Sequence, residues 1–344
     1  MNPLITALLI TSLSTSTIIT MTSNHWLLAW LGLELNTLSM LPMIMKPSHP
    51  RSTEATTKYF LVLATAAALY LCATTLNAWQ TGQWTILHTP SPTTTMLLIT
   101  ALALKLGLAP LHLWYPDVLQ GSTIPTALII TTWQKIAPLT LLMLMNTHLN
   151  TTTLMTFGLI SASLAGWTGL MQTQTRKIMA FSSIAHMGWV ILALSLDQPL
   201  TTLTMTLYIM MTATLFTTLA TTMTKTILDL GTTWPSSPTL LTMTMITLLS
   251  LGGLPPLTGF MPKWLILKTL APLPTLSTLM LFTSLPSLFF YTRLAYMTML
   301  TTPPTTTNTE YKWRLETSLK PSTMLLPPLA LLMLPMTPML HNTT

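Results

Sequence analysis

The sequence has 344 residues, of which 50% are hydrophobic and only 6% are charged, and its formal net charge is +7. Because a soluble domain carries about 25% charged residues, this composition excludes a soluble fold that covers its surface with charge. The single cysteine excludes an intrachain disulfide, a cysteine-ligated zinc site and an iron–sulfur cluster held by this chain alone.

Apolar runs of roughly 18 to 22 residues recur from end to end, which is the length that crosses ~30 Å of hydrocarbon as a helix. We therefore expect an all-α, polytopic membrane bundle of about eleven transmembrane helices. The expected spans are 3–21, 26–45, 58–78, 94–112, 123–145, 150–171, 178–196, 200–222, 239–260, 274–298 and 323–341. The one long polar stretch, 301–322, is expected to be a surface loop before the last helix.

The basic residues of the loops predict the orientation, because Lys and Arg concentrate on the inner side of a membrane. With alternating crossings, ten of the fourteen lie on the side of the N-terminus: Lys46, Arg51, Lys58, Arg176, Lys177, Lys225, Arg293, Lys312, Arg314 and Lys320. We therefore expect the N-terminus inside and the C-terminus outside. The start MNPLITALLI enters an apolar run without an Arg-rich amphipathic segment, so we expect no cleavable targeting peptide.

Two short motifs interrupt long apolar runs. Leu106-Gly-Leu-Ala-Pro110 is similar to Leu251-Gly-Gly-Leu-Pro255. Gly- and Pro-interrupted helices at corresponding places of two halves are typical of transporters with inverted repeats, and such breaks persist only where protein or water satisfies the freed backbone groups. Gly and Pro are also frequent in ordinary membrane helices, so this echo alone leaves both interpretations open.

Four ionisable residues lie inside the expected spans: Glu34, Lys105, Lys135 and Lys263. A charged side chain at a helix centre costs about 2.5–3.5 kcal/mol, so four of them cost on the order of 10 kcal/mol unless they pair or meet water. Removal from water favours the uncharged forms of amines and carboxylic acids, so such groups can exchange protons near neutral pH. We interpret them as a proton relay, with a structural Glu–Lys pair between helices as the alternative. Lys263 is nearer a helix end, where it could instead snorkel to the membrane surface.

Two histidines, His112 and His186, lie within or beside the spans. Histidine can shuttle protons near neutral pH, but a single membrane histidine is as often a satisfied hydrogen-bonding residue. Asp117 is expected in a short loop beside the first break, where it either guides protons or, as we prefer, caps a helix.

The segments that carry these residues resemble a known family. They are residues 23–36, 105–114, 172–188 and 251–264. They are similar to the corresponding segments of the NADH-ubiquinone oxidoreductase chain 2 family, the mitochondrially encoded, antiporter-like subunits in the membrane arm of respiratory complex I. The resemblance runs over essentially the whole chain.

The resemblance implies two inverted five-helix repeats, each with a broken helix. These repeats would be residues 1–145 and 146–300, followed by a polar loop and a last transmembrane helix in 301–344.

The resemblance also implies roles for the buried residues in proton translocation. Glu34 and Lys105 would form the charge pair of the first repeat, Lys135 would be the central relay lysine, and Lys263 would lie beside the second break. His112 and His186 match positions of the family as further candidates for the relay.

By the same resemblance, this chain holds no cofactor, and NADH, FMN, iron–sulfur clusters and ubiquinone act elsewhere in the assembled complex. Its partners would be the other membrane-arm subunits, including neighbouring antiporter-like subunits, and lipids such as cardiolipin, but not nucleic acid. Its place would be the mitochondrial inner membrane, with the N-terminus in the matrix and the C-terminus in the intermembrane space. A stand-alone cation/proton antiporter and a purely structural subunit are the two alternative functions.

Overall fold

The computed structural model describes residues 3–86, 91–233, 237–299, 321–335 and 337. Within them the chain is helical, and seven helices are long and apolar enough to cross a membrane. Two shorter apolar helices, Pro92–Leu106 and Pro238–Gly252, and the 25-residue helix Pro274–Thr298 overlap three of the other predicted spans, so the all-α, multi-pass fold is confirmed. The chain divides into two compact units, residues 1–158 and 159–344.

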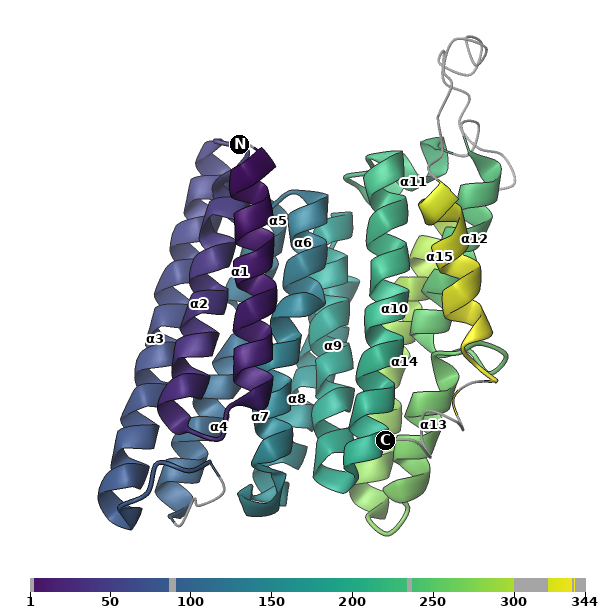
Figure 1. Ribbon diagram of the computed structural model, residues 1–344. Coiled ribbons are helices and arrows are strands. Elements are labelled where there is room, and N and C mark those ends of the chain that lie inside the picture. Colours follow the sequence, from purple (N-terminus) through teal and green to yellow (C-terminus); the bar gives the residue numbers. More distant parts are fainter. Residues whose placement is uncertain (1–2, 87–90, 234–236, 300–320, 336, 338–344) are drawn as a thin grey trace. The chain divides into compact units, whose positions relative to one another are not determined.

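The first unit begins with three long helices that lie side by side, α1, α2 and α3 (Figure 1). Its helices are α1 (Pro3–Thr22), α2 (Trp26–Met45), α3 (Pro50–Thr81), α4 (Pro92–Leu106), α5 (Trp114–Gly121), α6 (Ile124–Thr131), the short 3₁₀ helix η1 (Trp133–Lys135), α7 (Ile136–Leu144), η2 (Asn146–His148) and the start of α8 (Thr151–Leu170). Helix α3 begins earlier than predicted because His49 and Ser52 form a capping box and Pro50 occupies the first helical position.

The second unit contains α9, and 89% of the most apolar stretch of this helix is buried within the protein. Its helices are the rest of α8, α9 (Thr175–Leu196), α10 (Gln198–Thr222), α11 (Ile227–Thr232), α12 (Pro238–Gly252), α13 (Phe260–Thr269), α14 (Pro274–Thr298) and α15 (Pro321–Leu332). Within this unit α10 packs against α9, α12 and α15, and α14 packs against α12.

Both predicted breaks are confirmed, and they have the same backbone geometry. Helix α4 ends at Gly107 with φ +71°, and α12 ends at Gly253 with φ +87°. In each case the N–H of the following residue donates to the carbonyl oxygen five residues earlier, at 3.0 and 3.4 Å respectively, which is a Schellman-type helix end. The helices therefore stop before the predicted ends at 112 and 260, and the chain becomes helical again as α5 and α13.

Each unit also contains an isolated β-bridge between two of its loops. The segment before α2 pairs with the segment after α3 through a β-bridge between His25 and Thr85, and the segment before α9 pairs with the segment after α10 through Gln174 and Thr226. Each unit thus contains a β-bridge between the segments that flank two successive helices.

Other parts of the predicted organisation stay predictions. These are the boundary between repeats at residue 145, the assignment of residues 301–344 and the orientation of the termini. The basic residues Lys312, Arg314 and Lys320 lie outside the described residues.

The span predicted as one helix at 123–145 is interrupted. Pro138 has no N–H to donate and its ring crowds the carbonyl four residues earlier, at Gln134. The chain accordingly forms the 3₁₀ turn Trp133–Lys135 between α6 and α7. This interruption places Lys135 at a bend of the backbone rather than in a regular helix.

Candidate functional site

Two of the predicted relay lysines, Lys105 and Lys135, line one cavity of about 20 Å³ in the first unit. Lys105 lies in the last turn of α4 and is 9% exposed, and Lys135 lies in η1 and is 1% exposed. Asn36 and Gln134 border the same cavity, where the Gln134 Nε2 donates to the Asn36 Oδ1 at 2.9 Å. Because a water molecule needs roughly 10–15 Å³, this cavity has room for water beside both amines.

The first break positions an aromatic ring against Lys135. The Nζ of Lys135 lies 5.0 Å from the centroid of the Tyr115 ring, a cation–π geometry that stabilises a protonated amine by about 0.5–2 kcal/mol. Tyr115 is on α5, directly after the break, and a Cβ at Gly107 would approach its ring to 3.2 Å. The glycine that ends α4 therefore also leaves room for the ring that contacts Lys135.

Glu34 lies on α2, half-buried, and its Oε2 is a buried atom without a hydrogen-bond partner in the described part of the chain. The same holds for the Nζ of Lys105, and no ion pair joins the two groups. The charge of Glu34 nevertheless acts on Lys105 and on the neighbouring Tyr59. Glu34 and Lys105, the predicted charge pair, thus interact electrostatically but make no direct contact.

His112 lies in the turn between α4 and α5 and is 6% exposed. It hydrogen-bonds the backbone of Pro110 and is not among the residues that border the cavity of the two lysines. The structure therefore places His112 at the first break but does not bring it to Lys105 or Lys135, and its role in a relay stays a prediction.

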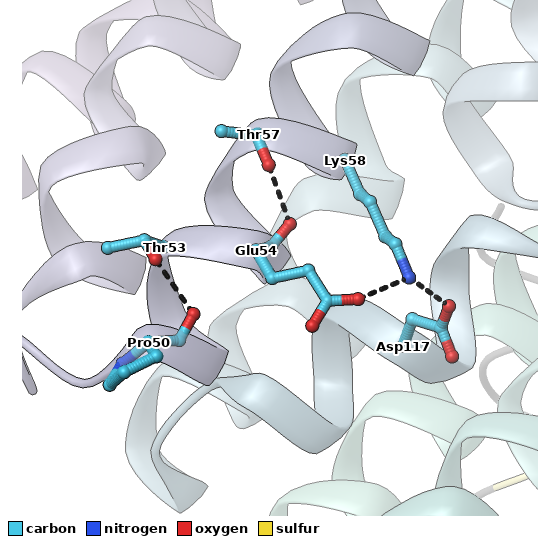
Figure 2. A network of polar contacts seen from close by, with 6 residues as sticks. All are labelled: Pro50, Thr53, Glu54, Thr57, Lys58 and Asp117. Carbon is cyan, nitrogen blue, oxygen red and sulfur yellow. Dashed lines mark hydrogen bonds and ion pairs between the residues drawn. The ribbon is translucent and has the colours of Figure 1, made fainter.

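An ionic network at the first turns of α3 ties that helix to α5 (Figure 2). The Lys58 Nζ lies 2.8 Å from the Glu54 Oε1 and 2.7 Å from the Asp117 Oδ2. The prediction that Asp117 lies in a loop and caps a helix is wrong, because this residue is helical, in the first turn of α5, and pairs with Lys58. All three side chains are at least 40% exposed, so solvent and salt screen this network.

In the second unit, Lys263 caps the broken helix. It lies in the first turn of α13, and its Nζ donates to the carbonyl oxygen of Gly252 at 2.9 Å. The last carbonyls of a helix have no partner within that helix, and a cation there meets the negative end of the helix dipole. Its Nζ also lies 6.0 Å from the centroid of the Trp189 ring. Lys263 therefore points back to the end of α12.

His186 and Lys263 border one cavity of about 30 Å³ in this unit. His186 is on α9, and its Nε2 lies 3.1 Å from the hydroxyl of Tyr291 on α14. The ring of Tyr208, on α10, lies 5.6 Å from that of His186. The structure thus brings two of the predicted site residues of the second unit together around a space that can hold water.

The sequence did not single out the uncharged residues of the two sites. These are Asn36, Tyr115 and Gln134 in the first unit and Trp189, Tyr208 and Tyr291 in the second. Their only signal in the sequence is a polar or aromatic side chain inside an apolar run. Among the described residues, no group of three or more His, Cys, Asp or Glu side chains could hold a metal ion.

Comparison with known proteins assigns the chain to a family. The family described as NADH:quinone oxidoreductase/Mrp antiporter, TM, matches residues 23–300, and the family NADH dehydrogenase subunit 2 C-terminus matches residues 288–341. NADH-ubiquinone oxidoreductase chain 2 of Salmo salar is 51% identical, and the match covers 98% of each chain. The same protein of Struthio camelus is 49% identical, and the match covers 99% of each chain.

The fold has the same relatives. A chain in the structure of respiratory complex I from Thermus thermophilus with bound aureothin matches with a TM-score of 0.85 and 25% identity, covering 99% of this chain and 80% of that one. Sequence, break geometry and buried charges agree: the chain belongs to the NADH-ubiquinone oxidoreductase chain 2 family of antiporter-like membrane subunits.

Proposed function

We propose that this chain translocates protons as a membrane-arm subunit of a proton-pumping NADH:ubiquinone oxidoreductase, with Glu34, Lys105, Lys135 and Lys263 as its relay. The observation that carries the proposal is the first cavity, which Lys105 and Lys135 both border and which has space for water. This geometry lets a proton move between groups through water.

A structural ion pair is the weaker explanation for Glu34 and Lys105. Two charges that serve stability alone are expected to make a direct, hydrogen-bonded contact, because each isolated charge in a membrane costs about 2.5–3.5 kcal/mol. Here Glu34 Oε2 and Lys105 Nζ are both buried and make no such contact within the described residues. Groups held apart in this way can change their protonation one at a time, and each change alters the affinity of the other for a proton.

The second unit supplies the last proposed relay site. Lys263 is stabilised as a cation by the Gly252 carbonyl and the end of α12, and the water-sized cavity beside it reaches His186. A proton held at Lys263 can therefore exchange with water in that cavity. His186, which contacts the Tyr291 hydroxyl, is the second proton-binding group there.

The driving reaction takes place outside this chain. NADH oxidation and ubiquinone reduction, with their FMN and iron–sulfur cofactors, belong to other subunits, and the chain receives their energy as electrostatic or conformational change. With the N-terminus in the matrix and the C-terminus in the intermembrane space, protons would move outward across the mitochondrial inner membrane. Each charge moved against the membrane potential requires about 2.3 kcal/mol per 100 mV, so the relay must be gated against backflow. Neighbouring antiporter-like subunits and cardiolipin are the expected contacts of the lipid- and subunit-facing surface.

Replacement of Lys135 tests the proposal. We expect Lys135→Met, in the assembled oxidoreductase reconstituted into liposomes, to oxidise NADH while moving fewer protons per electron pair. Lys268→Met is the matched control, because Lys268 is exposed on α13 beside the Trp264 ring, and we expect its proton ratio to be unchanged. Equal ratios in both variants and the unaltered protein would contradict the relay, leaving a structural role. Cation–proton exchange by the purified chain alone would support the stand-alone antiporter instead.

A further inference from the structure

A buried tyrosine next to the proposed relay has an unused hydroxyl. Tyr59 is on α3 and is 1% exposed, and its hydroxyl oxygen has no hydrogen-bond partner among the described residues. A buried hydroxyl left without a partner is unfavourable, because it has lost its hydrogen bonds to water. Buried polar groups of this kind normally bind ordered water when space allows.

The surroundings of Tyr59 provide both space and charge. Tyr59 borders the cavity of about 20 Å³ that Lys105 and Lys135 also border. The charge of Glu34 acts on Tyr59 as well as on Lys105. Two buried polar groups without partners among the described residues, the Tyr59 hydroxyl and the Lys105 Nζ, thus belong to residues that border one water-sized space. A third, the Glu34 Oε2, belongs to a residue of α2 that does not border this space but lies in sequence between two that do, Leu33 and Asn36.

The position of Tyr59 is fixed by two neighbouring contacts to α5. Its ring meets the edge of Trp114, with centroids 5.9 Å apart and an interplanar angle of 67°. The preceding residue, Lys58, pairs with Asp117 on the same helix (Figure 2). These contacts hold the ring in place, so its hydroxyl cannot turn out to solvent without breaking the packing of α3 on α5.

We propose that the Tyr59 hydroxyl is a further member of the relay, which joins the Glu34 carboxylate to the Lys105 amine through water in the cavity that Tyr59 and Lys105 border. This inference rests on the proposed function. A phenol hydroxyl both donates and accepts a hydrogen bond. It can therefore take a proton from one water molecule as it gives its own proton to the next acceptor, and it ends unchanged and uncharged. Tyr59 positions the water between two groups that do not touch each other.

The same helix offers a matched control. Tyr70 is also buried on α3, at 0% exposure, and its hydroxyl also has no partner among the described residues. Its ring meets Trp26 edge-on, with centroids 6.0 Å apart and an interplanar angle of 63°. Tyr70 differs in that it does not border the cavity of the lysines. We expect removal of either hydroxyl to affect packing equally, and we expect only removal of the Tyr59 hydroxyl to affect the relay.

The experiment compares Tyr59→Phe with Tyr70→Phe in the assembled oxidoreductase reconstituted into liposomes. We expect Tyr59→Phe to slow proton translocation roughly twofold to tenfold, the fold-change that corresponds to loss of one hydrogen bond, with the amount of assembled complex unchanged. Tyr70→Phe is expected to translocate protons at the normal rate. Infrared difference spectra give a second measurement: the carboxyl band that Glu34→Gln removes should shift in Tyr59→Phe and not in Tyr70→Phe.

The outcomes separate this inference from the proposed function. If Lys135→Met uncouples the complex while Tyr59→Phe matches Tyr70→Phe in rate and in the carboxyl band, the relay stands and the role of Tyr59 is refuted. If Lys135→Met has no effect on the proton ratio, the proposed function itself fails. A lower amount of complex with an unshifted carboxyl band in Tyr59→Phe would show a packing role only and would also refute the inference.

Discussion

Substitution of Gly253 by alanine tests whether the contact between Lys263 and the end of α12 is important for function. This glycine ends α12 with φ +87°, a conformation that L-residues rarely adopt. A Cβ there would lie 3.1 Å from both the Cδ and the Nζ of Lys263. In Gly253→Ala, the lysine must therefore move by a few tenths of an ångström, away from the carbonyl that it now binds at 2.9 Å.

The magnitude has two parts. An alanine in the left-handed region costs about 1–2 kcal/mol. Complete loss of a hydrogen bond from a charged amine costs about 1.5–3 kcal/mol, and a partial displacement forfeits a fraction of it, on the order of 1 kcal/mol. We therefore expect Gly253→Ala to lower stability by about 2–3 kcal/mol and also to reduce proton translocation, because Lys263 loses the group that stabilises its charge.

Gly82 provides the control for the backbone term. It ends α3 with φ +71°, and a Cβ there would have no atom within 4 Å. Gly82→Ala should therefore show only the left-handed penalty of about 1–2 kcal/mol and a normal proton ratio. The assays are the thermal denaturation midpoint of the assembled oxidoreductase and its proton ratio in liposomes. If the two variants have the same midpoint and the same normal proton ratio, the contact between Lys263 and the end of α12 has no functional importance, and the reasoning is refuted.

Two further predictions concern the second unit. A Cβ on Gly259 would overlap the backbone carbonyl oxygen of Ser250, so Gly259→Ala should cost more than the 1–3 kcal/mol typical of overpacking, measured as reduced assembly. Gly252→Ala, whose Cβ would lie 3.7 Å from its nearest neighbour, should assemble normally, and equal assembly of both would contradict the packing described. At the start of α11, partial burial raises the pKa of Asp229, but hydrogen bonds from the backbone of Thr226 and Lys225 and from the Thr226 side chain, together with the charge of Lys225, lower it by more, so the net pKa lies below its usual value. A lowered folded-state pKa stabilises the fold above the unfolded pKa, and this stabilisation is lost as the pH falls. The midpoint difference between the unaltered chain and Asp229→Asn should therefore shrink between roughly pH 5 and pH 3, and a pH-independent difference would refute the capping role.

The approximate positions of the membrane helices followed from the sequence, because they depend on local properties. An apolar run of about 20 residues predicts a transmembrane helix, and the described helices overlap the predicted spans. The two breaks also followed, since Gly107 and Gly253 permit a left-handed backbone that other residues resist. The interruption at η1 was equally local, and Pro138 is the signal that could have predicted it.

The identities of the buried ionisable residues also followed from the sequence, because a charge inside an apolar span is costly wherever it lies. Their partners did not. The sequence suggested that Glu34 and Lys105 form a pair, whereas the structure leaves them in electrostatic range without contact. It allowed Lys263 to reach the membrane surface, whereas the structure binds it to the end of α12.

Only the tertiary structure decided which groups share a water-sized space. Tyr59 and Tyr70 are identical residues on one helix, with equal burial and similar aromatic neighbours. One borders the cavity of the lysines and the other does not, because helices distant in sequence surround different parts of α3. Charge and backbone preference are properties of a residue and its near neighbours, so the sequence determined the helices, the breaks and the buried charges. Which residues of different helices lie close together depends on the whole fold, so only the tertiary structure decided which residues border the cavity of the proposed relay.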